Sequence, residues 1–178
     1  GPTDFIQVHA EVNAALIGRA LAELAPGPDD AVLDAFAGIG NFSLPLAQRA
    51  GTVVALEGAG SAVEWARRNA ATAGLANVDC VTADLAGAGA GGAWTRRRFR
   101  LALLDPPRAG AREILAPLAA TGVERLVYVS CHPGTLARDA GILLREHGFH
   151  LAAAGVLDMF PHTSHVEAMA VFTRGAAG

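Results

Sequence analysis

Cys131 has both the chemistry and the position of a reactive residue. It directly follows the apolar stretch 126–130, and Pro133 and Gly134 after it predict the start of a helix. A thiolate is a strong nucleophile, and partial positive charge at a helix N-terminus would stabilise it. The second cysteine, Cys80, lies inside a predicted strand, where we expect a buried, inert thiol. We therefore predict that Cys131 is placed to react.

Acidic residues stand at the ends of four other predicted strands. They are Asp34, Glu57, Asp84 and Asp105. Ligands of open parallel sheets bind beyond the carboxyl ends of the strands, so we expect these acids and Cys131 to line one edge. Ordinary strand-end capping is the alternative interpretation for each acid taken alone.

The first of these acids opens a glycine-containing turn, D-x-x-x-G-x-G, with Gly38 and Gly40. A dinucleotide fingerprint would require a third glycine where Ser43 stands, and Asp34 would repel a pyrophosphate. A cofactor with a positive centre would instead be attracted. Glu57 is placed to bind ribose hydroxyls and Asp84 to accept from an adenine amino group. As an ordered set, these residues favour S-adenosylmethionine over NAD.

Strand and helix patterns alternate along the chain, which predicts an α/β fold. We expect helices on both faces of a mostly parallel seven-stranded sheet, with one antiparallel strand from a terminal strand pair. Ser61 is the expected N-cap and Gly74 the expected stop of the third helix. The predicted strands are 31–36, 52–58, 78–84, 100–107, 123–131, 149–160 and 166–174, and the predicted helices are 9–25, 41–50, 61–74, 111–121 and 134–148.

Composition limits the remaining possibilities. The 178 residues suit one domain, and 52% of them are hydrophobic, which argues against disorder. No apolar run reaches the ~20 residues that span a bilayer, so no membrane partner is expected. Two cysteines cannot form a disulfide framework, which favours the cytoplasm. The arginines at 96–98 and 100 predict either a solvated loop or a phosphate contact, and 86–93 reads as a flexible loop.

Four motifs together resemble one enzyme family. They are DAFAGIGNFSLPLA, LLDPPRAG, YVSCHPGTLARD and DMFPHTSHVEAMAVF. In this order they resemble the bacterial RNA uracil-C5 methyltransferases, nearest to the branch that modifies 23S ribosomal RNA. The resemblance implies the Rossmann-like class I S-adenosylmethionine-dependent methyltransferase fold. It also implies a catalytic domain over residues 3–178, without the RNA-binding parts that family members usually carry ahead of it. We expect this domain to be a monomer. Residues 1–2 look like the scar of a cleaved tag.

The resemblance also implies roles at matching positions. Cys131 would be the nucleophile, and Glu167 the base that removes the C5 proton. Family members often carry Asn where this chain has His132. The residues implied for S-adenosylmethionine are Gln7, Phe36, Asn41, Glu57, Asp84 and Asp105, and those suggested for the substrate are Arg108, Phe160 and His162.

Several other functions remain open at this point. A transfer-RNA T-loop uracil-C5 methyltransferase and a non-catalytic S-adenosylmethionine-binding module both fit the motifs. A small-molecule methyltransferase would have no need of the Cys131 and Glu167 pair. An adenine N6-methyltransferase would carry an aromatic residue where Arg108 follows D-P-P. The cysteines and histidines lack zinc-ligand spacing, so no metal is expected. With a net charge of −3, we expect weak attraction to RNA phosphates.

Overall fold

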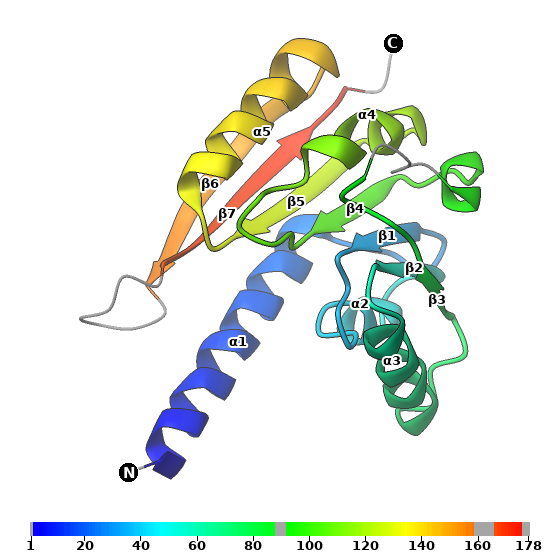
Figure 1. Cartoon of the computed structure of the whole chain (residues 1–178), viewed down its shortest axis with the longest axis vertical. Helices are drawn as coiled ribbons and strands as arrows, with labels where there is room; N and C mark the ends of the chain where they lie inside the picture. The colour runs from blue at the N-terminus through cyan, green and yellow to red at the C-terminus, as the bar shows by residue number, and fades with distance from the viewer. Residues whose placement is uncertain (1, 88–91, 159–165, 176–178) are drawn as a thin grey trace.

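The computed structural model describes residues 2–87, 92–158 and 166–175; the side chains of 2–10, 157, 158 and 166 lie outside the description. Helices and strands alternate along the chain (Figure 1). The helices are α1 (Pro2–Leu24), α2 (Ser43–Ala47), α3 (Gly60–Thr72), the 3₁₀ helix η1 (Ala93–Arg96), α4 (Arg112–Ala120) and α5 (Pro133–Glu146). The strands are β1 (Ala31–Ala35), β2 (Thr52–Glu57), β3 (Val78–Thr82), β4 (Leu101–Leu104), β5 (Arg125–Ser130), β6 (His150–Asp158) and β7 (Val166–Thr173).

The strands form one seven-stranded sheet in the order β3-β2-β1-β4-β5-β7-β6. The first five strands in this order are parallel to one another. Strand β7 runs antiparallel to β5 and to β6, between which it lies. This confirms the predicted mostly parallel sheet with one antiparallel strand. The carboxyl ends of β1, β2, β4 and β5 consequently meet at one edge of the sheet.

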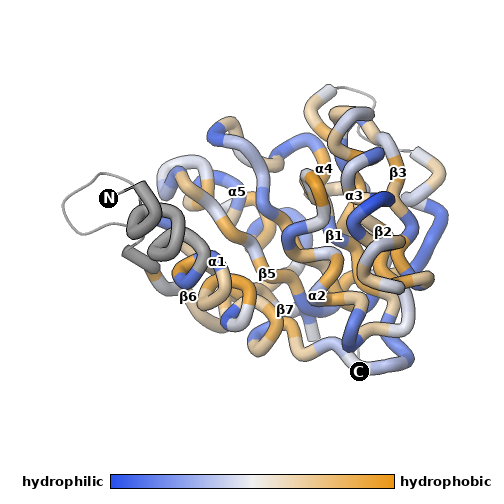
Figure 2. Tube along the Cα trace, turned by 90° about the horizontal axis from the view of Figure 1, so that it is seen from below, coloured by the Kyte–Doolittle hydropathy of each residue, from blue (hydrophilic) through white to orange (hydrophobic). Residues whose placement is uncertain are grey.

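Helices cover both faces of the sheet, as predicted. Helices α1 and α2 pack on one face, and α4 and α5 pack on the other (Figure 1). Successive strand residues point to opposite faces, so Val127 and Val129 contact the α1 side while Leu126 and Tyr128 contact the α5 side. In Figure 2 hydrophobic stretches run along the strands between the helices.

The helix boundaries differ from the sequence-based expectation, most of all at the start of α1. Helix α1 begins at Pro2, seven residues before the predicted start at residue 9. Helix α2 is limited to Ser43–Ala47, although Pro45 fits there because the first turn of a helix has no amide partners to lose. Ser61 is not an N-cap: α3 begins at Gly60, and Ala59 caps it without a side-chain bond. Helix α3 therefore begins one residue before the predicted start, with Gly60 as its first residue and no polar side chain as its N-cap.

Two of the clustered arginines are held by ion pairs within the chain. Arg97 contacts Asp79 at 2.6 Å, and Arg100 donates two 2.6 Å hydrogen bonds to the carboxylate of Asp30. The hydrogen bond from Arg100 lowers the pKa of Asp30. These pairs give both side chains a structural role. Residues 88–91, half of the glycine-rich stretch 86–93, lie outside the described residues. No helix within the described ranges could span a membrane.

Candidate active site

The acids and Cys131 gather at the predicted edge of the sheet. Asp34 lies within β1, Glu57 is the last residue of β2, and Asp105 directly follows β4. Cys131 directly follows β5 and is exposed, whereas Cys80 is buried in the core, as predicted. The topology therefore brings together residues from four separate parts of the chain.

Strand pairing brings the segments that carry Cys131 and Glu167 together. In the antiparallel β5–β7 ladder, Val129 is paired with Met169 and Ser130 with Ala168. The ladder ends at this last pair, directly before Cys131 and directly after Glu167, so we expect Cys131 and Glu167 to face each other. Directly opposed residues of an antiparallel pair lie on the same face of the sheet, with Cβ atoms about 5 Å apart. Met169 belongs to the α1 side, so the Glu167 side chain leaves β7 toward that side as well.

Asp105 lies close enough to Glu167 for their charges to interact. Burial raises the pKa of the Asp105 carboxyl to about 7, and the negative charge of Glu167 adds to the rise. The Asp105 amide donates to the Ala35 carbonyl at 3.4 Å, which ties this residue to the end of β1. A carboxyl with this pKa is only partly ionised at neutral pH, and a nearby cation would favour its charged form.

Asp34 is fully buried beneath this edge. Its Oδ2 atom accepts a 2.5 Å hydrogen bond from the Ser43 hydroxyl, and Oδ1 has no partner within the described structure. Burial raises the pKa of Asp34 to about 7; the bond from Ser43 opposes this rise, and the charges of Asp105 and Glu57 add to it. Buried carboxyl oxygens are normally hydrogen-bonded, so this orphaned atom suits a site that is completed by a cationic ligand.

The turn after β1 is wound tightly against β2. Phe36, Gly38 and Gly40 have φ angles of +65°, +55° and +97°. This conformation is costly for an aromatic residue, and strain of this kind clusters at functional sites. The Glu57 carboxylate accepts from the Gly38 amide at 3.0 Å and from the Ala59 amide at 2.9 Å. Glu57 thereby fixes the turn while its remaining lone pairs stay available for a ligand.

Two other residues assigned to the cofactor have partners on the protein. The Oδ1 atom of Asp84 accepts from the Ala86 and Gly87 amides at 3.0 and 3.1 Å, the strand-end capping that was the alternative interpretation. Asn41 exchanges two 3.0 Å hydrogen bonds with Asn13 of α1. Their roles toward a cofactor remain predictions.

The other predicted site residues are only partly described. Arg108 is exposed on the loop after β4. Gln7 lies in α1, in the part whose side chains are outside the description, and Phe160 and His162 lie outside the described residues. The roles of these four residues remain predictions.

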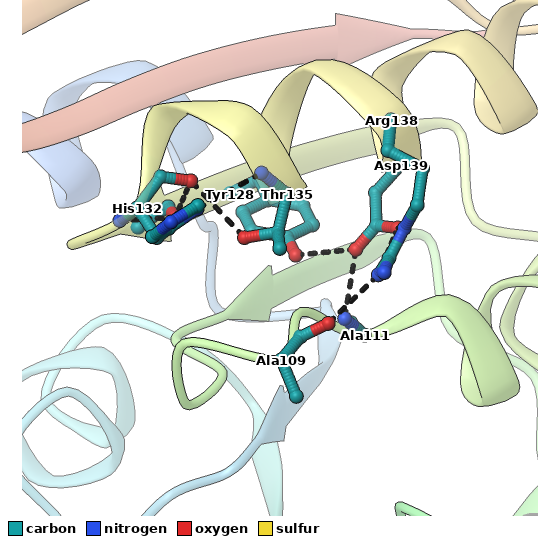
Figure 3. A network of polar contacts seen from close by, with 8 residues as sticks. Ala109, Ala111, Tyr128, His132, Thr135, Arg138 and Asp139 are labelled. Atoms are coloured by element: carbon teal, nitrogen blue, oxygen red, sulfur yellow. Dashed lines mark hydrogen bonds and ion pairs between the residues drawn. The ribbon is translucent and has the colours of Figure 1, made fainter.

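His132 has a structural role that sequence reasoning missed. It is the N-cap of α5, and its Nδ1 atom accepts from the Thr135 amide at 3.2 Å (Figure 3). The His132 amide in turn donates to the Ser130 hydroxyl at 3.0 Å. These bonds hold the backbone on both sides of Cys131. An Asn, common at this position in the family that the sequence resembles, could cap the helix in the same way.

The charge at this edge suits a cationic ligand. S-adenosylmethionine carries a sulfonium and an ammonium group, and both would be attracted by the carboxyls at this edge. Asp34, Glu57 and Asp105 are the residues that could hold it. Among the described residues no group of three or more His, Cys, Asp or Glu side chains could hold a metal ion.

Comparison with known proteins agrees with this geometry. Residues 2–175 match the family described as tRNA (Uracil-5-)-methyltransferase. The chain is 57% identical over 175 residues to the 23S rRNA (uracil(1939)-C(5))-methyltransferase RlmD of Alkalilimnicola ehrlichii. The match covers 98% of this chain and 39% of that relative, so the chain spans well under half the length of this curated relative.

Solved structures share the fold. The tRNA (uracil-54, C5)-methyltransferase of Pyrococcus abyssi, in complex with S-adenosyl-L-homocysteine, aligns with a TM-score of 0.75 at 30% identity, covering 90% of this chain and 38% of that one. The magnesium protoporphyrin IX methyltransferase of Synechocystis aligns with a TM-score of 0.68 at 20% identity, covering 97% of this chain and 83% of that one. The latter supports the class I methyltransferase fold alone.

Proposed function

The chain belongs to the tRNA (uracil-5-)-methyltransferase family, and we propose that it methylates C5 of a uridine in 23S ribosomal RNA. The observation that supports this proposal best is the β5–β7 register, whose last pair, Ser130 with Ala168, adjoins Cys131 and Glu167, together with the charge interaction between Glu167 and Asp105. A nucleophile and a base are the two protein groups that this reaction requires. Ribosomal RNA is preferred to transfer RNA because the relative with the higher identity acts on 23S rRNA.

Cys131 would begin the reaction on the pyrimidine ring. Its Sγ atom attacks C6 of the uracil, and the electron pair of the C5–C6 double bond moves into an enolate that makes C5 nucleophilic. Cys131 is exposed at the edge of the sheet and lies immediately ahead of α5, whose N-terminal amides favour negative charge. An extrahelical uridine can reach an exposed thiol of this kind. A reduced thiol is required, which is consistent with location in the cytoplasm.

Glu167 would complete the reaction. After alkylation C5 carries both the methyl group and its original proton. Glu167, which adjoins the Ser130–Ala168 pair at the Cys131 end of the ladder, would take this proton. The electron pair of the C5–H bond then restores the C5–C6 double bond and expels the Cys131 thiolate. One cysteine and one carboxylate therefore account for both protein-dependent steps.

S-adenosylmethionine, when bound, would supply the electrophilic methyl group to C5. Asp34 and Asp105 would attract its positive charge, and Glu57 would bind the ribose hydroxyls. The Gly38 and Gly40 turn would lie against the cofactor, because glycine allows close approach of the backbone.

A trapping experiment tests the proposal. The chain is incubated with S-adenosylmethionine and a 23S rRNA transcript containing 5-fluorouridine, in which fluorine replaces the C5 proton that a base would remove, so that the Cys131 adduct cannot be released. A covalent protein–RNA complex is expected on a denaturing gel. The Cys131→Ala variant should form none, whereas the matched control Cys80→Ala, which alters a buried thiol in the sheet, should retain it. A complex that persists in Cys131→Ala would overturn the proposal.

A further inference from the structure

A buried carboxylate on α5 holds the loop that follows β4. Asp139 is fully buried, and its Oδ2 atom accepts from the Ala111 amide and from the Tyr128 hydroxyl, both at 2.7 Å (Figure 3). The neighbouring Arg138 donates to the Ala109 carbonyl at 2.8 Å and contacts the Asp139 carboxylate. Two consecutive residues of α5 thus bind a carbonyl and an amide that flank Gly110.

The loop is packed closely against these side chains. Gly110 has a φ angle of +86°, and a Cβ atom there would lie 2.5 Å from Nη2 of Arg138 and 2.6 Å from Oδ2 of Asp139. The Gly110 amide donates to the Pro107 carbonyl at 2.9 Å, which closes a tight turn around Arg108. The turn that carries Arg108 is therefore fixed by its own backbone hydrogen bond and by the packing of two α5 side chains against Gly110.

The hydrogen-bond donors around Asp139 stabilise its contact with the loop. Tyr128 is fully buried in β5, and burial raises the pKa of its hydroxyl well above the ordinary value, so it remains a hydrogen-bond donor. A buried carboxylate with several donors is strongly held, because removing any of them leaves unpaired charge out of water. Tyr128 is also two residues ahead of Ser130, whose hydroxyl accepts from the His132 amide next to Cys131. The same elements, β5 and α5, thus support both loops.

We propose that Asp139 is a positioning residue that fixes the turn carrying Arg108 relative to Cys131, so that the target uridine is aligned for attack. This inference rests on the proposed function and goes beyond it, because Asp139 lies beneath the loops and would touch neither cofactor nor RNA. We expect the cofactor site to be unaffected by a change at Asp139. The amide of Asp105, at the other end of the loop, is anchored to Ala35 of β1 rather than to α5.

The test compares Asp139→Asn and Tyr128→Phe with the control Asp79→Asn, which breaks only the exposed pair with Arg97. Hydrogen–deuterium exchange should accelerate in residues 106–111 of Asp139→Asn, because Asn offers one neutral acceptor oxygen to the Ala111, Tyr128 and Arg138 donors that two carboxylate oxygens now serve. Adduct formation with 5-fluorouridine 23S rRNA should slow by about tenfold or more in this variant, since small misplacements of reacting groups are costly. Tyr128→Phe, which keeps the ring in the core, should slow adduct formation less. The affinity for S-adenosylhomocysteine should stay within about twofold of the wild type in all three variants.

Each outcome has a distinct meaning. Unchanged exchange in residues 106–111 of Asp139→Asn would overturn the inference whatever the activity. Faster exchange with unchanged adduct formation would also overturn it, because the contact would then be structural only. A parallel loss of cofactor affinity and adduct formation would indicate general damage rather than positioning. A wild-type chain that forms no adduct would refute the proposed function instead, and the exchange result alone would then decide whether Asp139 holds the loop. If Asp139→Asn fails to fold, Tyr128→Phe decides by the same criteria.

Discussion

The Ser43 hydroxyl donates a 2.5 Å hydrogen bond to one oxygen of the fully buried Asp34 carboxyl and leaves the other oxygen without a partner. A half-satisfied carboxyl inside a parallel sheet destabilises the folded chain. Its position under the proposed cofactor site gives a reason for this cost. A bound cation would neutralise the charge that burial disfavours, so the site is electrostatically prepared for S-adenosylmethionine before it binds.

The affinity for S-adenosylmethionine should increase with pH through neutrality. The pKa values of Asp34 and Asp105 are both raised to about 7, and the ionised forms attract a cation more strongly. If one such ionisation controls binding, the affinity should rise roughly tenfold from pH 6 to pH 8. Calorimetric titration at constant ionic strength measures this change. Asp105→Asn should bind more weakly and with a flatter pH profile; a wild-type affinity that is independent of pH would contradict the assignment.

The stability of the ligand-free chain should change with pH in the opposite direction. Asp34 has a folded-state pKa of about 7, above its ordinary value of 3.8, so the folded state binds more protons in this interval. Its favourable contribution is complete below pH 3.8 and is lost as the pH rises through about 7. Asp34→Asn should therefore remove part of the decrease in unfolding free energy between pH 5 and pH 8. Urea denaturation at both pH values tests this, and an equal decrease in wild type and variant would refute it.

Replacement of Glu167 should arrest the reaction after methyl transfer. Glu167→Gln retains the size of the side chain but removes the base opposite Cys131. We expect a covalent, methylated protein–RNA complex to accumulate with ordinary uridine RNA, and product release to fall by 10²-fold or more, of the order typical for loss of a general base. Mass spectrometry of the complex measures both. Glu146→Gln, an exposed change at the end of α5, is the control. Free product at the wild-type rate from Glu167→Gln would exclude this role.

Sequence reasoning predicted the residues at the edge of the site, but it missed the buried residue that holds the neighbouring loop in place. Strand–helix alternation is a periodic signal, and it correctly predicted that Asp105 and Cys131 lie at the carboxyl ends of parallel strands, although the strands end one to three residues earlier than predicted. Asp139 was missed, although a signal existed: it lies three residues after Leu136 and four before Leu143, on the buried stripe of α5. A charge at such a position requires buried partners, but a sequence cannot name them. They are Tyr128 of β5 and the Ala111 amide, which only the fold brings together.

The cap at His132 should depend on a side-chain acceptor rather than on imidazole itself. His132→Asn keeps an acceptor for the Thr135 amide and should retain stability. His132→Ala removes it and should lower the unfolding free energy by about 1 kcal/mol. Chemical denaturation compares the two variants, and the alkylation rate of the exposed Cys131 reports on the adjoining backbone. Equal stability of the Asn and Ala variants would show that the side-chain bond contributes nothing.

Gly110 should tolerate no side chain, for a reason that links stability to catalysis. Gly110→Ala would place a methyl group at a φ of +86° and against two side chains of α5. Arg138 is partly exposed and can move aside, but the buried Asp139 cannot do so without leaving Tyr128 and Ala111 unpaired.

We therefore expect Gly110→Ala to lower the unfolding free energy by about 2 kcal/mol and to slow adduct formation as Asp139→Asn does. Gly18→Ala is the matched control, because no atom lies within 4 Å of a Cβ at this helical position. It should stabilise the chain by about 0.5–1 kcal/mol and leave the rate unchanged. Thermal denaturation and the 5-fluorouridine assay give both quantities. A Gly110→Ala variant with wild-type stability and rate would show that the turn can leave α5 without consequence.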